Sequence, residues 1–317
     1  MAKKKVRKLT VTQKIMQSVF EKLEKYTHDV TRKQYARQIK LYIKFCRESY
    51  NVRSFDECKE YIQKYSDYLQ KKEYSASTIH TYLAAVCAVF DVDLAAIKKP
   101  LRHVAEYTKG RNKVYDNARS DLDNPKWSYI IGFQKKVGIR REELQRLTGK
   151  DFTYDESRNP CVVIRRGKGG KTQYQRVLDK DVDFVKSYFD TVQSEERVFD
   201  DKYFKNDINF HKLRAECAKD YYLETLRKLN EEHDYAELLE KEIKARWATM
   251  NKSKSGKVKR FLDCQLKGIY TLRGKNRQLA IEKGLPLHYD KRALLATSIF
   301  KLSHWRNDVT IASYLLA

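Results

Sequence analysis

The chain has 317 residues, of which 66 are Lys or Arg and 42 are Asp or Glu, so its formal net charge is +24 at pH 7. A length above the usual size of one hydrophobic core favours two domains, and the basic excess favours a polyanionic partner, nucleic acid before an anionic membrane surface. No run approaches the roughly 18 apolar residues of a membrane span, and "MAKKKVRKL" lacks the apolar region of a signal peptide, so we expect a cytoplasmic protein without a membrane partner.

The first third of the chain shows the periodicity of amphipathic helices. Apolar residues recur at helical spacing within residues 35–46, 58–69 and 79–90, and "SAST" supplies N-cap residues before the last of these segments. Any single basic residue on the polar faces is explained by solvation, but the collective excess indicates a binding function. We predict a helical domain over residues 1–105, with nucleic acid as the partner that the basic excess favours. Periodicity then lapses in "KKPLRHVAEYTKGRNKVYDNA", which predicts a linker over residues 106–120.

A second domain is predicted over residues 121–317, helical at first. The segment "PCVVIRRGKGGKTQYQRVL" then contains two β-rich runs, residues 162–165 and 174–178, separated by a Gly/Lys turn, which is typical of a hairpin with a basic tip. Later, "YYLETLRKLNEEHDYAELLEKEIKARWATM" combines alternating charge with leucines at helical spacing. The expected fold class is therefore mainly α, with a small β-sheet or hairpin in a mixed α+β second domain.

The hairpin tip "GKGGKT" ends like a nucleotide-binding phosphate loop. That motif requires a glycine where Arg165 stands, and it lies between a strand and a helix, whereas here strands flank the turn. The pattern therefore argues against ATP binding. The glycines instead let a tight turn carry Lys168 outward, toward a ligand or toward water.

The six cysteines are scattered without any C-x-x-C pair, and several fall on apolar helical positions. We expect reduced, packed thiols, with neither a disulfide nor a zinc site.

Two pairs of residues at helical spacing have both an ordinary and a functional explanation. Arg140 and Glu143 in "GIRREELQRL" form either a common surface ion pair or part of a site. His211 and Arg214 in "FHKLRAECA" lie on one helical face, where they can hold the same phosphate, although a surface histidine is equally ordinary.

The order of these motifs along the chain is more specific than any one of them. The segments "VGIRREELQRL", "RRGKGGKTQYQRVL", "HKLRAECA" and "LSHWRNDVTIASYL" resemble, in this order, the first-arginine motif, lysine hairpin, His-x-x-Arg box and final His-to-Tyr segment of the tyrosine recombinases, or phage integrases. A further segment, "YTLRGKNRQLAIEKGLPLHYDKRALLATS", resembles integrases of integrative conjugative elements, also called conjugative transposons.

The resemblance implies a SAM-like, helical core-binding domain followed by a catalytic domain. About ninety residues separate Arg214 from His304, where relatives have a few dozen, so we expect a charged helical insertion at about residues 219–265. The interval from His304 to Tyr314 is one residue longer than the common spacing, and Trp305 stands at the common distance. Since the family tolerates His or Trp there, His304 is preferred on its "LSH" context and Trp305 is kept as the alternative.

The chemistry follows from phosphodiester cleavage. Arg140, Arg214 and His304 can donate hydrogen bonds to the nonbridging oxygens and stabilise the extra negative charge of the transition state without a metal or cofactor. Tyr314 acts as the nucleophile and forms a 3′-phosphotyrosyl bond, so rejoining needs no ATP.

Three further side chains complete the predicted chemistry. His211 accepts the phenolic proton, a role that the resemblance also implies. Lys168 protonates the 5′-oxygen leaving group, and Glu143 orients Arg140 and His211.

The resemblance also implies the biology. Family members act as tetramers on double-stranded DNA with short inverted core sites, and they integrate, excise or resolve DNA. We expect a bacterial enzyme on the nucleoid that moves a mobile element, with an excision factor as a further partner. A type IB topoisomerase, which usually has lysine where His211 stands, and an inactive DNA-binding relative are the alternatives. Ala317 ends the sequence without the C-terminal helix that relatives pass to a neighbour, so either assembly differs or the chain is truncated.

Overall fold

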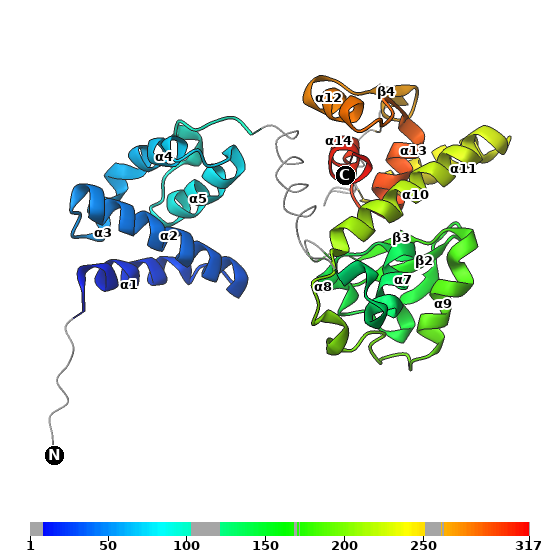
Figure 1. Ribbon diagram of the computed structural model, residues 1–317, viewed down its shortest axis with the longest axis horizontal. Helices are drawn as coiled ribbons and strands as arrows, with labels where there is room; N and C mark the ends of the chain where they lie inside the picture. The colour runs from blue at the N-terminus through cyan, green and yellow to red at the C-terminus, as the bar shows by residue number, and fades with distance from the viewer. Residues whose placement is uncertain are drawn as a thin grey trace, which may run out of the picture. The chain divides into compact units, whose positions relative to one another are not determined.

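The computed structural model of the protein describes residues 9–102, 121–167, 170, 172–250, 261 and 263–316. The chain divides into two compact units, Met1–His103 and Val104–Ala317, drawn in Figure 1 in blue to cyan and in green to red. Each unit is described by itself. The predicted linker over residues 106–120 lies outside the described residues, as does the hairpin tip at Lys168.

The first unit consists of helices. They are α1 (Val11–Leu23), α2 (Asp29–Tyr50), α3 (Phe55–Cys58), α4 (Ile62–Lys71) and α5 (Ala76–Val89). Hydroxyl side chains cap three of them, because the hydroxyls of Thr10, Ser54 and Ser75 accept backbone N–H groups that the first helical turn leaves free. Ser75 belongs to "SAST", so the N-cap predicted there is confirmed.

Aromatic rings fill the core of the first unit. Tyr42 of α2 is fully buried, and its ring centroid lies 4.9 Å from that of Tyr65 and 5.7 Å from that of Phe90. Helix α2 packs against α1 and α5, which places the apolar stripes predicted from the periodicity on the inside.

In the second unit, helices α7 (Ser128–Val137) and α8 (Arg141–Leu144) precede a three-stranded antiparallel sheet. Its strands are β1 (Phe152–Tyr154), β2 (Pro160–Ile164) and β3 (Gln173–Arg176), paired in that order, with Ile164 opposite Gln173. The predicted hairpin is therefore confirmed as β2–β3, whereas β1 was not predicted. Helix α9 (Val182–Asp190) follows the sheet.

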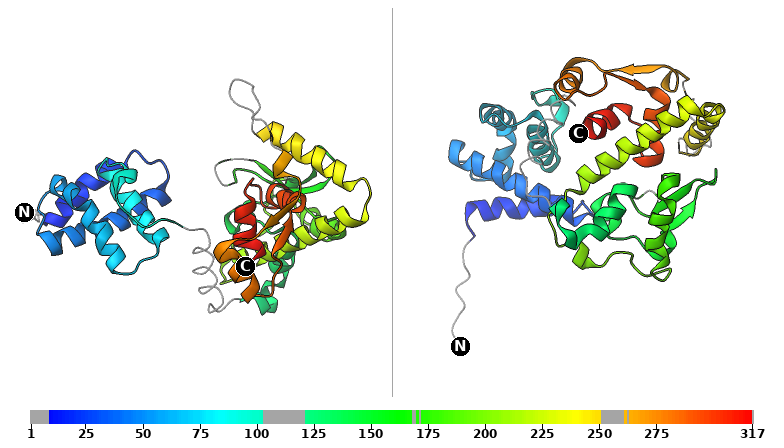
Figure 2. Two further views of the ribbon diagram at one scale, coloured as in Figure 1. Left: turned by 90° about the horizontal axis from the view of Figure 1, so that it is seen from above. Right: turned by 45° about the vertical axis from the view of Figure 1, so that its right-hand side comes forward.

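The long helix α10 (Phe210–Glu231) organises the second unit. It contacts α7 on one side and α13 (Lys291–Ala296) and the last turn, η10 (Ile311–Leu315), on the other, as the three views in Figures 1 and 2 show. Gly138, which ends α7 with a φ of 67°, permits the close approach to α10, because a Cβ at this position would lie 2.9 Å from the Cβ of Cys217.

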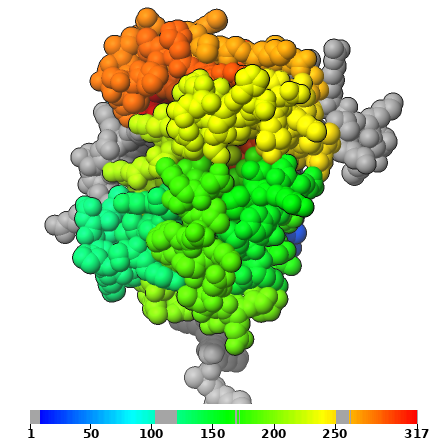
Figure 3. Space-filling view, turned by 90° about the vertical axis from the view of Figure 1, so that its right-hand side faces the viewer, coloured from blue at the N-terminus to red at the C-terminus, as the bar shows by residue number. Residues whose placement is uncertain are grey.

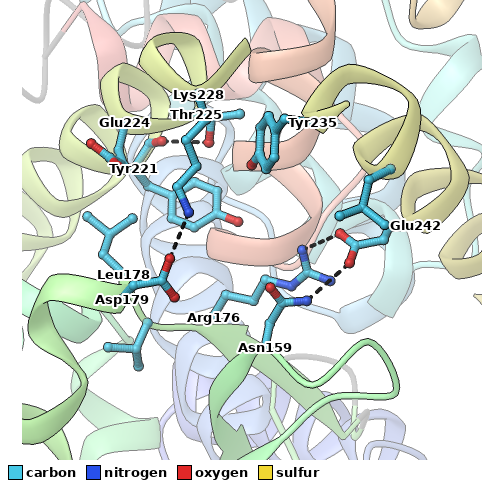
Figure 4. Close-up of a pocket in the computed structure, with 12 residues that line it drawn as sticks. Asn159, Arg176, Leu178, Asp179, Tyr221, Glu224, Thr225, Lys228, Tyr235 and Glu242 are labelled. Atoms are coloured by element: carbon cyan, nitrogen blue, oxygen red, sulfur yellow. Dashed lines mark hydrogen bonds and ion pairs between the residues drawn. The ribbon is translucent and has the colours of Figure 1, made fainter. Parts of the chain in front are cut away.

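Helix α11 (Tyr235–Met250) falls within the predicted insertion, yet it contributes to the core. Leu239 and Ile243 are buried in a cluster that includes Phe300. Glu242 forms an ion pair with the buried Arg176 of β3 at 2.7 Å (Figure 4). Figure 3 shows α11 (yellow) between the sheet-bearing segment (green) and the segment near residue 275 (orange). This helix is thus an integral part of the second unit.

The remaining elements lead to the end of the chain. They are β4 (Ile269–Thr271), α12 (Gly274–Glu282), β5 (His288–Asp290), α13, the π-helical turn η9 (Thr297–Lys301), α14 (Asn307–Thr310) and the π-helical turn η10. Strands β4 and β5 form a second antiparallel sheet that was not predicted. The architecture is mainly helical with small antiparallel sheets, as the sequence indicates.

Two further sequence expectations concern thiols and membranes. Five of the six cysteines are buried, as predicted for packed thiols, but Cys264 is exposed. Within the described residues, no helix has both the length and the apolar character needed to cross a membrane.

Candidate active site

Tyr314 lies among two histidines and an arginine. It belongs to the π-helical turn η10 and is 8% exposed. Its ring centroid is 5.4 Å from that of His211 and 6.3 Å from that of His304, and the Cζ of Arg214 lies 5.8 Å from it. The structure therefore brings the end of the chain against the start of α10, although about a hundred residues separate them in the sequence.

The first turns of α10 present His211 and Arg214. The side chain of Asn209 accepts the N–H of Lys212 and fixes the start of the helix, so His211 and Arg214 share one face. Arg214 is 2% exposed. Its Nη1 donates to the carbonyl of Gly138, and its Nη2 donates to that of Leu302 at 3.1 Å. The guanidinium thus joins the turn after α7 to the turn that carries His304.

His304 is held by its backbone and by one ring nitrogen. Its N–H donates to the carbonyl of Ser298 at 2.8 Å, and its Nδ1 accepts the N–H of Arg306 at 3.3 Å. Burial and the nearby charges of Arg214 and Arg140 lower the pKa of His304 to about 4. The ring is therefore neutral near pH 7, and because Nδ1 accepts, Nε2 carries the proton and is a donor.

Arg140 and Glu143 form an ion pair in which the carboxylate is buried and the guanidinium is partly exposed. The Nη1 of Arg140 donates to the Oε1 of Glu143 at 2.7 Å, and its backbone N–H donates to the Oε2 at 3.1 Å. Glu143 is 3% exposed, so this is no ordinary surface ion pair. The carboxylate orients the guanidinium at the start of α8. The predicted contact of Glu143 with His211 stays a prediction.

Two predicted residues, Lys168 and Trp305, remain. Lys168 is outside the described residues, between the ends of β2 and β3. Trp305 packs edge-on against Trp247 of α11, with ring centroids 4.8 Å apart, and it adjoins a different hydrophobic cluster from that of Tyr314. Of the two alternatives His304 and Trp305, the structure brings His304 to the tyrosine.

Three buried polar atoms near these residues have no hydrogen-bond partner within the described part of the chain. They are the Nε of Arg214, the Nε2 of His304 and the Oγ of Ser303. Buried polar atoms are nearly always paired, so a cluster of unpaired ones indicates a place for a polar ligand. Sequence reasoning missed Ser303, whose only signal is its position beside His304. Its φ of 58° is also uncommon for a residue other than glycine.

This arrangement suits an anion with oxygen acceptors. The guanidinium of Arg214, the neutral imidazole of His304 and the imidazole of His211 lie around the phenol of Tyr314, and the charge of Arg140 acts on His304. Such groups can stabilise a developing oxyanion and accept or hold a proton. Among the described residues, no group of three or more His, Cys, Asp or Glu side chains is arranged to hold a metal ion.

Neither a protein-family model nor a curated protein sequence matches the chain. Among solved structures, the chain is similar to one described as the crystal structure of XerA recombinase, with 17% sequence identity and a TM-score of 0.24, over 67% of this chain and 84% of that one. A likeness of this strength carries no argument about activity. The function has to come from the residues of the site itself.

Proposed function

We propose that this protein is a tyrosine-type site-specific DNA recombinase that cleaves and rejoins strands through a 3′-phosphotyrosine intermediate. The observation that carries the proposal is the position of Tyr314, whose ring lies 5.4 Å from His211 and 6.3 Å from His304, with Arg214 over it at 5.8 Å. A phenol among these groups has a proton acceptor and a set of donors for a phosphate.

The reaction uses each group once. The Oη of Tyr314 attacks the phosphorus and gives its proton to His211. Arg140, Arg214 and the Nε2 of His304 donate to the nonbridging oxygens as negative charge builds on them. The bond from phosphorus to the 5′-oxygen breaks, and Lys168 protonates the leaving oxygen. In the reverse direction, a 5′-hydroxyl attacks the phosphotyrosine, releases Tyr314 and restores the phosphodiester without a cofactor.

A basic groove on the first unit supports DNA as the partner. It has a volume of about 730 Å³, and four cationic residues of α2 line it: Arg37, Lys40, Lys44 and Arg47. They follow one face of the helix over three turns, which suits a row of phosphates. We infer a helical DNA-binding domain over residues 1–105, a linker over 106–120 and a catalytic domain over 121–317.

The remaining parts of the proposal concern biology. The protein works as a tetramer on short inverted core sites in the bacterial cytoplasm, integrates and excises a mobile element such as a conjugative transposon, and is directed by an excision factor. These parts rest on the resemblance of the sequence motifs.

The test is covalent capture in EDTA. The protein is incubated with nicked suicide duplexes taken from DNA that flanks its own gene, beside the Tyr314→Phe variant. We expect a denaturant-resistant adduct with the wild-type protein and none with the variant. An adduct with both proteins would exclude Tyr314 as the nucleophile. Adducts at unrelated sequences, together with relaxation of supercoiled plasmid, would instead indicate topoisomerase activity.

A further inference from the structure

The segment that joins the end of α7 to Arg140 is held in an uncommon way. The carbonyls of four consecutive residues, 136–139, each accept a hydrogen bond from a buried side chain. The donors, in the order of the carbonyls, are Lys301, Gln175, Arg214 and Gln134. The last carbonyls of a helix commonly face water or bond to the backbone that follows. Here these carbonyls instead accept hydrogen bonds from side chains of η9, β3 and α10, which connect those elements to the end of α7.

Lys301 is the most unusual donor of the four. It is 1% exposed, and its Nζ donates to the carbonyl of Lys136 at 2.8 Å and to that of Arg176 at 3.0 Å. Within the described residues, its ammonium forms no ion pair with a carboxylate. Its other neighbours are the thiol of Cys217 and the ring of Tyr221.

An ammonium in such surroundings loses its hydration and is costly unless other groups replace the water. The two carbonyls do so in part, and the negative end of the α7 dipole favours a cation at this point. A methionine of similar length would fill the same space without this cost. The buried ammonium of Lys301 is therefore better explained by the two backbone segments that it holds together than by a gain in stability.

The two acceptors of Lys301 lie on segments that carry predicted catalytic residues. Lys136 lies in the last turn of α7, four residues before Arg140, and Arg176 ends β3, one strand of the hairpin whose sequence includes Lys168. Lys301 itself ends η9 and is followed shortly by His304. One ammonium thus joins the last turn of α7, the end of β3 and the turn that precedes His304.

The strand that supplies the second acceptor is itself fixed. The Nε of Arg176 donates to Asp155 at 2.7 Å, and its Nη1 donates to Glu242 at 2.7 Å. Its guanidinium also stacks on Phe300, with Cζ 3.7 Å from the ring centroid. Figure 4 shows Arg176 reaching toward Glu242 of α11. The carbonyl that Lys301 binds is therefore part of a rigid support.

We propose that Lys301 is a positioning residue for phosphoryl transfer, which aims Arg140 by holding the carbonyls of Lys136 and Arg176 against the turn that carries His304. This inference rests on the proposed function. Lys301 does not touch the substrate. It acts through Arg140, so its loss should reproduce the loss of a correctly placed guanidinium rather than a general loss of folding.

The experiment compares two suicide duplexes with the full chain, one with a phosphate and one with a neutral methylphosphonate at the cleaved position. The methylphosphonate develops less negative charge for Arg140 to stabilise. A misplaced or missing Arg140 should therefore slow adduct formation less on methylphosphonate than on phosphate. Lys301→Met removes the donor and keeps the length of the side chain. We expect the rate of adduct formation to fall roughly 100-fold on phosphate, the size of loss that a small misplacement produces, and only a few-fold on methylphosphonate. Arg140→Ala should show the same preference.

Thr225→Val is the matched control, because it removes a buried hydroxyl that donates to the carbonyl of Tyr221 and leaves the hydrogen bonds to residues 136–139 in place. Any loss of rate in this variant should be equal on the two substrates. Gln175→Met removes the donor to Val137 and serves if Lys301→Met does not fold; it should show the same substrate preference with a smaller loss. If Lys301→Met lowers the rate equally on both substrates, the positioning role of Lys301 is wrong, while the proposed function still stands. No adduct from wild-type protein on either substrate overturns the proposed function, and this inference with it.

Discussion

The two units of the protein bury polar groups in different ways. Among the described residues of the first unit, the buried polar side chains are the neutral Gln38 and Ser66, in a core of apolar and aromatic residues. In the described part of the second unit, six side chains of charged residue types are buried: Glu143, Asp151, Arg176, Asp181, Arg214 and Lys301.

This difference indicates where the exact position of a charged side chain is important for function. Burying a charge costs several kcal/mol of desolvation, which pairing only partly offsets, so buried charges are poor devices for stability alone. In the second unit, Glu143 and Arg214 belong to the candidate site, and the ammonium of Lys301 donates to the carbonyl of Arg176. In the first unit, the cations of α2 lie at the surface, where a partner can reach them.

Arg214→Ala should give the largest contrast between the units. The carbonyls of Gly138 and Leu302 lose their buried donor, so we expect the second unit to lose about 3 kcal/mol of unfolding free energy. The rate of adduct formation should fall about 10³-fold, because a phosphate donor is lost as well. Arg37→Ala, an exposed control in the first unit, should change stability by less than about 0.5 kcal/mol.

Fluorescence separates the two units, because all three tryptophans, Trp127, Trp247 and Trp305, lie in the second. Circular dichroism follows the helices of both. If Arg214→Ala and Arg37→Ala change the free energy of unfolding equally, the contrast between buried and surface cations is wrong.

The pH dependence of stability should differ between the units through His304. Its pKa is lowered to about 4 in the folded protein, mainly by burial, so the unfolded chain binds the proton more readily. The stability contributed by the neutral ring is present above about pH 6.5 and is lost as the pH falls from there to about 4, by up to about 3 kcal/mol. Tryptophan fluorescence should report this loss, and His304→Gln should reduce it. An unchanged slope in the variant would show that His304 does not titrate in this window.

Removing surface cations of α2 should affect binding and leave stability unchanged. In the double variant Lys40→Ala with Lys44→Ala, we expect roughly tenfold weaker DNA binding at moderate salt. The slope of log affinity against log salt concentration should become about 2 units less negative. The melting temperature is the control and should stay constant. A salt slope equal to that of the wild-type protein would exclude this face of α2 as a phosphate contact.

Ser303→Gly should give the smallest effect, in the stabilising direction. Ser303 has a φ of 58°, a conformation that glycine adopts without steric cost, so relief of this strain should add about 1 kcal/mol to the second unit. Denaturant unfolding followed by tryptophan fluorescence measures it. A loss of stability would mean that the Ser303 hydroxyl makes a contact worth more than the strain.

Local sequence patterns predicted the elements with strong periodicity. The runs around Val163 and Tyr174 are β-rich and bounded by a glycine turn, and they form β2 and β3. Strands β1, β4 and β5 were missed because each has only three residues, too few to show an alternating pattern. The helix of the predicted insertion was recognised, but its role in the core depends on Glu242 reaching a strand far away in the sequence.

The candidate site was predicted from the order of motifs, which carries no information about burial. The spacing of Arg140 and Glu143 indicated a helical pair, but that spacing is the same for an exposed and for a buried carboxylate. In the structure the carboxylate of Glu143 is buried. Lys301 could not be found from the sequence, because lysines are almost always at the surface and no local pattern marks a buried one. Its role is visible only when the carbonyls of Lys136 and Arg176 meet in space.

The π-helical turn at Ile311–Leu315 explains how the number of residues between two site residues can change during evolution. A π-turn is what a helix forms when it gains one residue without being disrupted, because the extra residue widens a single turn and the flanking turns keep their faces. The interval from His304 to Tyr314, one residue longer than is common in the family that the sequence resembles, contains this turn. A single-codon insertion can therefore lengthen the motif while the phenol stays beside His304 and His211. Sequence searches for such sites should allow the gap to vary by one.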